Sequence, residues 1–451
     1  MKKFARLLIP AILVIAIAAM FAFTTSAAAT ATSGNVVYIA ADGTGDGSSP
    51  DKPLGNDADY QPCTNGTHVN NAFFKAYDMV NVDGGTIVVV GEIRIDTAAS
   101  RVPTAPGVRN TPSEFEVNTP KIDGVNVPST DRKPITITSV YNGVDYRTKG
   151  AKIVLDHATC NVSAFMFKNP MTIDNIDFEY IYVSGEGNAW NVPFMIGFWG
   201  YESVVGAGVK VTSYDKGENA PGDIFPILLG GHRYSNITDQ RGTNLTVKGG
   251  TWSQICGGSY GMSGDYGNIT ESINLTIDGD VKAEYVFGTN TFDVAIGKAA
   301  GPVNVTINSG EIGEFYFVNQ TFYEGTGGKI VIGKDAKIGL IDYAPEDYLG
   351  DASHLMAQFT VTNNSTTKIG QPEPETTVAP ETSAAPETTA APATTATPVD
   401  SEDEPKETNA PVEAPKDEAE EGSNMGLIIG IVAAVVVVAV VVVVVLKKKK
   451  A

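Results

Sequence analysis

Five side chains near the middle of the chain have types and a spacing that could support chemistry. Asp174, Asp177 and Glu179 alternate with apolar residues, so they would project from one outer strand face, near Asp156 and His157. Carboxylates gathered on one face are the ligands that Ca2+ takes. Two of them can act as the acid and base of glycoside hydrolysis. A solvated strand face explains the pattern more simply, so these residues are weak catalytic candidates, and Ca2+ is the one cofactor they could hold.

Aromatic side chains form a second set of candidates, for binding rather than catalysis. They lie in or beside Gly- and Asn-rich segments, where an aromatic ring can stack on the apolar face of a sugar. The candidates are Trp190, Trp199, Tyr201, Trp252, Tyr260 and Tyr266. For Trp199 and Trp252, filling the interior of the fold is the simpler interpretation.

Other chemistries find little support in the composition. Cys63, Cys160 and Cys256 form neither a metal-binding motif nor an even-numbered disulfide framework, and 4 histidines cannot build a rich metal centre. With 32 basic and 52 acidic residues, its net charge of -20 argues against a nucleic-acid partner.

The N-terminal end predicts export from the cytoplasm. Residues 1–29 begin with Lys2, Lys3 and Arg6, continue through an apolar run and end in small residues, as a secretory signal peptide does. An uncleaved anchor is the alternative, and Pro10 within the apolar run disfavours it.

The C-terminal end predicts one transmembrane helix over residues 425–446. The run Gly426–Leu446 is uncharged and, at about 1.5 Å per residue, long enough to cross a hydrocarbon core about 30 Å thick. The basic tail 447–451 follows it directly, whereas acidic residues precede it. The positive-inside rule therefore places the tail in the cytoplasm and the rest of the chain outside the cell membrane.

Residues 371–424 predict a disordered stalk in front of the membrane. This segment consists almost entirely of Pro, Thr, Ala and Glu, so it has too little apolar surface to offset the entropy lost on folding. Its acidic excess and frequent prolines should keep it extended.

The remaining middle of the chain repeats itself. Short segments with alternate apolar positions recur 25 to 38 residues apart, and self-similarity at such a period is typical of a solenoid. These segments are Ile135–Thr138, Met171–Asp174, Val209–Thr212, Leu245–Lys248, Leu275–Asp278, Val305–Asn308 and Ile330–Gly333. A second series follows them about 30 residues apart, at Leu228–Gly231, Ile255–Gly258, Val286–Thr289 and Phe317–Gln320.

Short strands in every repeat, with no helical period between them, predict an all-β fold in which a parallel β-helix fills residues 85–370. An antiparallel sandwich is the alternative, because it also has many short strands and turns. Residues 30–84 precede the repeats and should hold a first strand and a capping helix. The apolar stripe within Asn70–Val82 is the predicted helix, covering the N-terminal end of the stack.

Two segments resemble a known family. Val37–Pro53 resembles the entry segment of secreted right-handed parallel β-helix proteins of the pectate-lyase-like superfamily, and Lys133–Ser139 is similar to their early coils. The resemblance covers about Val36 to Ile341 and implies a right-handed coil. That superfamily includes polysaccharide lyases, glycosidases and adhesins, so the resemblance alone does not name an activity.

The catalytic motifs of the superfamily are incomplete in this chain. Ile153–His157 resembles the Trp-Ile-Asp-His segment of pectate lyases, but the Trp is absent, and so is the Arg-rich segment expected further along. The adjacent Asp pair and the Gly-His-Gly run of the polygalacturonase branch are also absent.

These observations favour a noncatalytic cell-surface protein that presents a rigid rod for adhesion or glycan recognition. Its expected partners are the membrane, through Gly426–Leu446, and an extracellular polysaccharide or surface protein. A membrane-tethered polysaccharide lyase or glycoside hydrolase with a diverged site is one alternative, and a structural component of the envelope is another.

Overall fold

The structure is a computed structural model. It describes residues 35–62, 67–96, 113–158, 162–183, 193–217, 224–233, 237, 241–260, 267–290, 298–319, 323–346, 348 and 352–370. All of these belong to the first of two compact units, Met1–Thr377. The predicted signal peptide, stalk, transmembrane segment and cytoplasmic tail lie outside the described residues.

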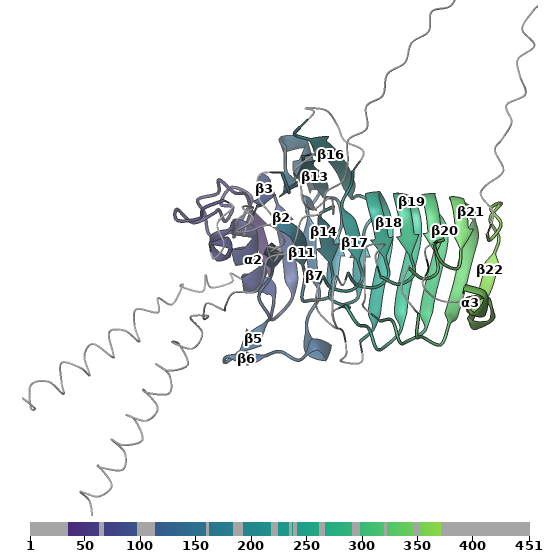
Figure 1. Ribbon diagram of the computed structural model, residues 1–451. Coiled ribbons are helices and arrows are strands. Elements are labelled where there is room, and N and C mark those ends of the chain that lie inside the picture. The colour runs from purple at the N-terminus through teal and green to yellow at the C-terminus, as the bar shows by residue number, and fades with distance from the viewer. Residues whose placement is uncertain are drawn as a thin grey trace, which may run out of the picture. The chain divides into compact units, whose positions relative to one another are not determined.

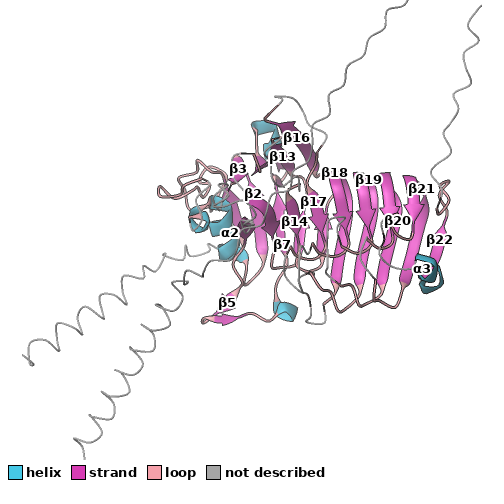
Figure 2. Ribbon diagram, viewed as in Figure 1, coloured by secondary structure: helices cyan, strands magenta, loops and turns pink. Residues whose placement is uncertain are grey.

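The fold is all-β, and parallel strands stack along one axis (Figure 1, Figure 2). The strands form three ladders of hydrogen-bonded neighbours, and from β2 to β17 the chain visits ladder 1, ladder 2 and ladder 3 in that order on every coil. This arrangement is compatible with a parallel β-helix, in which neighbouring coils lie about 4.8 Å apart.

The bounds of the strands follow from this order. Ladder 1 begins with β1 (Val36–Ile39), β2 (Gly85–Val89), β7 (Ile135–Thr138), β12 (Met171–Ile173) and β15 (Ser203–Val205). Ladder 2 contains β3 (Glu92–Ile95), β10 (Lys152–Asp156), β13 (Asp177–Tyr182) and β16 (Lys210–Asp215). Ladder 3 begins with β4 (Ser113–Glu116), β11 (Val162–Met166), β14 (Met195–Gly197) and β17 (Ile227–Leu229).

Four long strands follow, and each continues both ladder 1 and ladder 3. They are β18 (Thr243–Cys256), β19 (Ile273–Phe287), β20 (Val303–Tyr316) and β21 (Gly328–Asp342). The first half of β18 pairs with β15 and its second half with β17. The last described strand of ladder 1 is β22 (Phe359–Asn363), which pairs with β21.

One column of β-branched side chains runs through the interior of ladder 1. Its members are in register from coil to coil, and each is at most 2 % exposed: Ile87, Ile137, Ile173, Val205, Val247, Ile277, Ile307 and Ile332. Burying one such side chain stabilises the fold by about 1.5–3 kcal/mol. The periodic apolar positions of the sequence are therefore the core of the stack.

The predicted register is wrong at one coil of ladder 1. Val209–Thr212 was expected beside Met171–Asp174, but Val211 pairs with Phe178 in ladder 2. Val205 occupies the ladder 1 position instead, between Ile173 and Val247. Both strands alternate apolar and polar residues, and alternation marks a buried face without saying which ladder it belongs to.

The second predicted series is also displaced in its last member. Leu228, Ile255 and Val286 are in register as predicted, but their next partner in the ladder is Phe315 rather than Phe317. The series therefore shifts by two residues at β20, a step that keeps an apolar side chain on the inner face.

The predicted capping helix is α2 (Ala72–Val80), which lies within Asn70–Val82 and contacts β1 and β2. The side chain of Asn71 caps it by accepting a hydrogen bond from the Phe73 N–H group. Phe73 and Tyr77 are fully buried; the Phe73 ring meets Phe165 at 5.1 Å, and the Tyr77 hydroxyl donates to Asn169 Oδ1 at 2.7 Å. The helix thus packs against the interior of the first coils.

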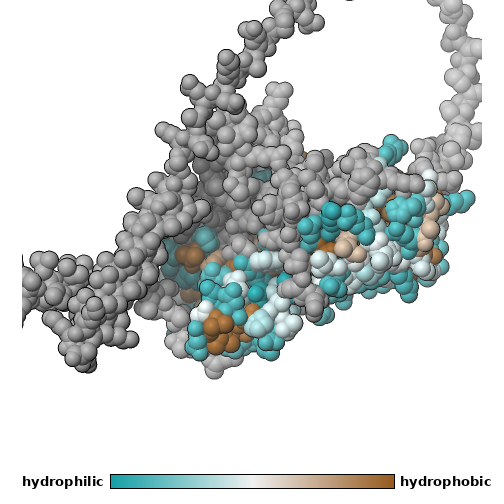
Figure 3. All heavy atoms as spheres, turned by 60° about the horizontal axis from the view of Figure 1, so that its bottom comes forward, coloured by the Kyte–Doolittle hydropathy of each residue, from teal (hydrophilic) through white to brown (hydrophobic). Residues whose placement is uncertain are grey.

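The remaining elements are short. They are the hairpins β5 (Lys121–Ile122) with β6 (Val125–Asn126) and β8 (Val140–Tyr141) with β9 (Val144–Asp145), the 3-10 helices η1 (His68–Asn70), η2 (Ser129–Asp131) and η3 (Tyr146–Lys149), and the helix α3 (Ala352–Gln358). Figure 3 views the side on which the β5–β6 hairpin projects; the residues coloured there are mainly hydrophilic, with a few small apolar areas. Within the described ranges, no helix has the length and apolar character needed to cross a membrane.

Candidate functional site

Asp156 lies in an ion pair on the outer side of ladder 2. Ile93, Ile95, Ile153 and Leu155 face the core, so the residues between them on β3 and β10 project outward. Arg94 Nη1 donates to Asp156 Oδ2 at 2.6 Å. The Asp156 side chain is 1 % exposed and that of Arg94 is 38 % exposed, so a buried carboxylate is paired with a partly solvated cation.

A second buried carboxylate, Asp96, follows β3 directly. It is 2 % exposed, and the Tyr60 hydroxyl donates to its Oδ1 atom. Burial raises the pKa of Asp96, and the nearby charge of Asp156 adds to that rise. Burial likewise raises the pKa of Tyr60, which keeps its proton for this hydrogen bond.

Glu179 belongs to a neighbouring network on the same side of ladder 2. Lys152 Nζ donates to Glu179 Oε2 at 2.6 Å and lies 3.5 Å from Glu92 Oε2. Glu92 also lies 3.3 Å from Arg94 Nη2. Charged side chains from three neighbouring strands therefore pair with one another across the ladder. Such pairing is typical of a solvent-exposed strand face whose charges already have partners.

The other carboxylate candidates lie at coil corners and strand starts. Asp174 precedes the turn from β12 to β13, and its Oδ1 accepts hydrogen bonds from the N–H groups of Asn175 and Gly208, both at 2.8 Å. Asp177 Oδ1 lies 3.7 Å from Arg147 Nη1. Asp174 thus joins two successive corners, away from the contacts that hold Asp156.

His157 contacts a tyrosine of the interior. It is 4 % exposed, and its Nδ1 atom lies 3.1 Å from the hydroxyl of the buried Tyr180. That hydroxyl also accepts the N–H group of Phe194 at 3.1 Å. Tyr180 thus connects His157 on ladder 2 to the start of the next ladder 3 strand.

Two of the aromatic candidates fill the core. Trp252 is 2 % exposed, and its Nε1–H group donates to the Gly249 carbonyl at 3.1 Å. Tyr260 is 1 % exposed, with the Arg233 guanidinium 5.7 Å from its ring centre. The Tyr260 ring is enclosed, whereas Trp252 is among the residues that line the groove described below.

Trp199 and Tyr201 sit among basic side chains. The Trp199 ring lies 4.8 Å from Lys168 Nζ and 4.6 Å from the His232 ring. Tyr201 is 4 % exposed and faces the Arg241 guanidinium at 4.2 Å and that of Arg132 at 5.2 Å. Trp190 and Tyr266, the remaining two candidates, lie outside the described residues.

Trp199 also has an unusual backbone conformation. Its φ of +47° lies in the left-handed region, which bulky residues rarely adopt. Its N–H group donates to the Gly231 carbonyl at 2.8 Å, and its own carbonyl accepts Arg241 Nη1 at 2.9 Å. These contacts hold the ring in its position at the corner after ladder 3.

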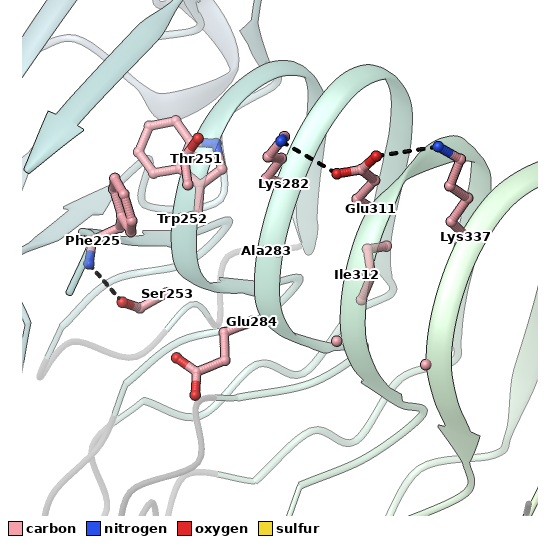
Figure 4. Close-up of a pocket in the computed structure, with 12 residues that line it drawn as sticks. Phe225, Thr251, Trp252, Ser253, Lys282, Ala283, Glu284, Glu311, Ile312 and Lys337 are labelled. Carbon is pink, nitrogen blue, oxygen red and sulfur yellow. Dashed lines mark hydrogen bonds and ion pairs between the residues drawn. The ribbon is translucent and has the colours of Figure 1, made fainter. Parts of the chain in front are cut away.

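An open groove crosses the outer face of β18 to β21, between ladder 1 and ladder 3 (Figure 4). Its volume is about 610 Å³. One wall is a row of side chains in register, Lys282, Glu311 and Lys337. Glu311 binds both lysines, with Oε2 at 3.3 Å from Lys282 Nζ and Oε1 at 3.1 Å from Lys337 Nζ. The hydrogen bonds from Lys337 and Lys282 lower the pKa of Glu311, so Glu311 is ionised at neutral pH.

The floor of the groove is bare because two of its residues are glycines. A Cβ atom on Gly313 would meet the Glu284 carbonyl at 2.6 Å, and one on Gly339 would meet the Gly313 carbonyl at 2.7 Å. The coils can pack at their normal spacing here only without side chains. Phe225 and the exposed Glu284 complete the groove, which therefore offers apolar surface, hydrogen-bonding groups and open access.

The residues most relevant to these sites were not singled out from the sequence. Arg94 and Asp96 could have been found from the same sequence pattern as Asp177 and Glu179, because polar and apolar side chains also alternate in Glu92–Asp96. The groove is harder to predict from the sequence, because its wall residues lie on different strands and are neighbours only once the register of those strands is known. In the part of the chain that the structure describes, no three His, Cys, Asp or Glu side chains are placed to hold a metal ion.

Comparisons of the chain with protein-family models, with curated proteins and with solved structures found no match.

Proposed function

We propose that this chain is a noncatalytic cell-surface protein, a right-handed parallel β-helix of the pectate-lyase-like kind, and that it binds an extended extracellular polysaccharide. The observation that carries the proposal is the groove over β18 to β21. It is open, runs across four coils in register, and combines the Phe225 ring with charged hydrogen-bonding groups.

The chemistry of the groove suits a sugar polymer. Sugar hydroxyls accept hydrogen bonds from ammonium groups and donate them to carboxylates, and the apolar face of a sugar ring packs on an aromatic side chain. Equivalent positions repeat about every 4.8 Å along the stack, so a polymer lying along the axis would meet one charged hydrogen-bonding group of the wall on each of three successive coils.

Surface display rests on the sequence of the two ends. The signal peptide 1–29, the stalk 371–424 and the membrane run Gly426–Leu446 would hold the rod outside the cell. Protease added to intact cells should release the folded part. Full protection from the protease would mean that the orientation in the membrane is the opposite of the one proposed.

The groove is tested with a polysaccharide array and the full chain in mild detergent. Lys282→Ala combined with Lys337→Ala should weaken binding at least tenfold, because the variant removes two donors from the groove wall. Lys298→Ala is the matched control, since Lys298 pairs with Glu324 at 2.9 Å and is 55 % exposed, close to the 57 % of Lys282, but lies outside the groove. Equal binding by the parent, the double variant and the control would mean that the groove is not the polysaccharide-binding site.

A second candidate function is polysaccharide cleavage at a diverged site. The observation in its favour is the pair of buried carboxylates, Asp96 and Asp156, which interact electrostatically beside Arg94. Asp156→Asn would then abolish release of sugar products. The proposal of a noncatalytic protein predicts no product release from the parent chain in the same assay.

A further inference from the structure

The two ends of the stack differ in how their edge strands are covered. At the N-terminal end, β1 pairs with β2 on one side, and the chain itself covers the other. Tyr38 N–H donates to the Gly47 carbonyl at 2.9 Å, and Leu54 N–H donates to the Tyr38 carbonyl at 2.8 Å. The isolated bridge from Ile39 to Leu54 adds to this cover.

At the C-terminal end, β22 pairs with β21, and no second partner strand for it is present among the described residues. A terminal strand with one neighbour presents a row of backbone N–H and C=O groups that can hydrogen-bond to another strand. Proteins usually protect such edges with Lys, Pro or a bulge. Phe359–Asn363 has no charged residue, no Pro and an unbroken register with β21.

The apolar surface at this end is also incompletely covered. Val361 and Ile369 are only partly buried, although both pack against the main core. Met356 on the adjacent helix α3 is 60 % exposed. A further strand beside β22 would bury these partly exposed apolar side chains on their open side.

The chain that follows does not suit this position. From β17 to β22, each ladder 1 strand begins 12 to 17 residues after the preceding ladder 3 strand ends, as from Tyr316 to Gly328 or from Asp342 to Phe359. Ile369 bridges to Ile341 in ladder 3, so the next ladder 1 strand would fall near residues 382–387. Pro386 lies there and Pro380 just before it, and proline cannot supply the N–H group that a ladder needs.

The sequence of β22 is suited to a second copy of itself. Thr360 and Thr362 are exposed on the outer face, while Phe359 is buried and Val361 partly buried on the inner face. In an antiparallel pair centred on Val361, each Thr360 lies opposite Thr362 of the other copy, and the two Val361 side chains meet over the core. Such a contact is isologous, so it closes as a two-fold dimer.

We propose that β22 is a self-association edge: two copies of this chain pair their β22 strands antiparallel, with Val361 at the two-fold axis, so that ladder 1 continues from one copy into the other. This inference does not depend on polysaccharide binding by the groove.

Cysteine cross-linking tests the register of this pairing in the full chain in detergent. Directly opposite residues of an antiparallel pair have Cα atoms about 4.5–5.5 Å apart, within the range that a disulfide spans. Under a mild oxidant, Val361→Cys should form a covalent dimer. The parent chain and Thr306→Cys, on the inner strand β20, should not. A Val361→Cys protein that stays monomeric in these conditions would overturn the proposal.

Charge placed on the edge gives an independent test that does not require a new cysteine. Thr360→Lys with Thr362→Lys sets like charges directly opposite each other and should weaken dimerisation at least tenfold by analytical ultracentrifugation. Thr276→Lys with Thr306→Lys is the matched control, with the same residue types on the same outer face but on the inner strands β19 and β20. A parent dimer that survives both double variants equally would place the contact elsewhere, for example in Gly426–Leu446, and would contradict the proposal.

Discussion

Arg94→Ala is the substitution that best separates a structural role of the Asp156 ion pair from a role in chemistry. The change leaves Asp156 at its position, where it is 1 % exposed, without the guanidinium that donates to it at 2.6 Å. A buried carboxylate that loses its cationic partner keeps the cost of desolvation and loses the attraction that offset it. The variant should therefore be strongly destabilised.

The magnitude follows from how the two partners are buried. Removing one partner of a fully buried ion pair costs about 3–5 kcal/mol. Arg94 is 38 % exposed, so water screens part of the interaction and we expect about 2–3 kcal/mol. Asp156→Asn should cost about 1 kcal/mol, because the amide oxygen still accepts from Arg94 and the remaining cation is partly solvated.

Urea unfolding of the full chain in mild detergent measures these differences by linear extrapolation. Lys298→Ala is the control, because it removes one partner of an exposed pair and should cost less than about 1 kcal/mol. An Arg94→Ala variant as stable as this control would refute the assignment of Asp156 as a buried, structurally paired carboxylate.

Two further predictions concern the N-terminal cap. Burial raises the pKa of Asp78, near the end of α2, to about 6. Because this pKa is raised on folding, the parent should lose stability relative to Asp78→Asn as pH rises from 3.5 to 7.5. The side chain of Asp78 is exposed, so water screens the effect and we expect a loss of about 1 kcal/mol. Urea midpoints across that range check this, and a constant difference would contradict it. Phe73→Ala empties a fully buried site against Phe165 and should cost about 3–5 kcal/mol; a loss below about 1 kcal/mol in the same assay would mean that α2 does not cap the core.

The sequence predicts the architecture better than the register. Apolar side chains at every second position give strands, and Ile137, Ile173, Val247 and Ile277 stack as their spacing predicts. Val205 was missed because Ser203–Val205 is too short to show alternation, while the longer Lys210–Asp215 shows it clearly in another ladder. Coil lengths vary with the turns between ladders, so spacing alone cannot assign a strand to its face.

The sites were harder to predict because they depend on contacts between distant strands. Arg94 and Asp156 are 62 residues apart, and only the pairing of β3 with β10 brings them together. The groove depends in turn on Gly313 and Gly339, which leave its floor open. In the sequence these two glycines cannot be told from the many others that serve turns.

The most direct test of the proposed function is to incubate the full chain with a panel of extracellular polysaccharides, with and without Ca2+, and to measure retention and released products together. The account predicts retention of at least one polysaccharide that depends on Lys282 and Lys337, with no product release in either condition. Product release that disappears in Asp156→Asn would contradict it and make this protein an enzyme.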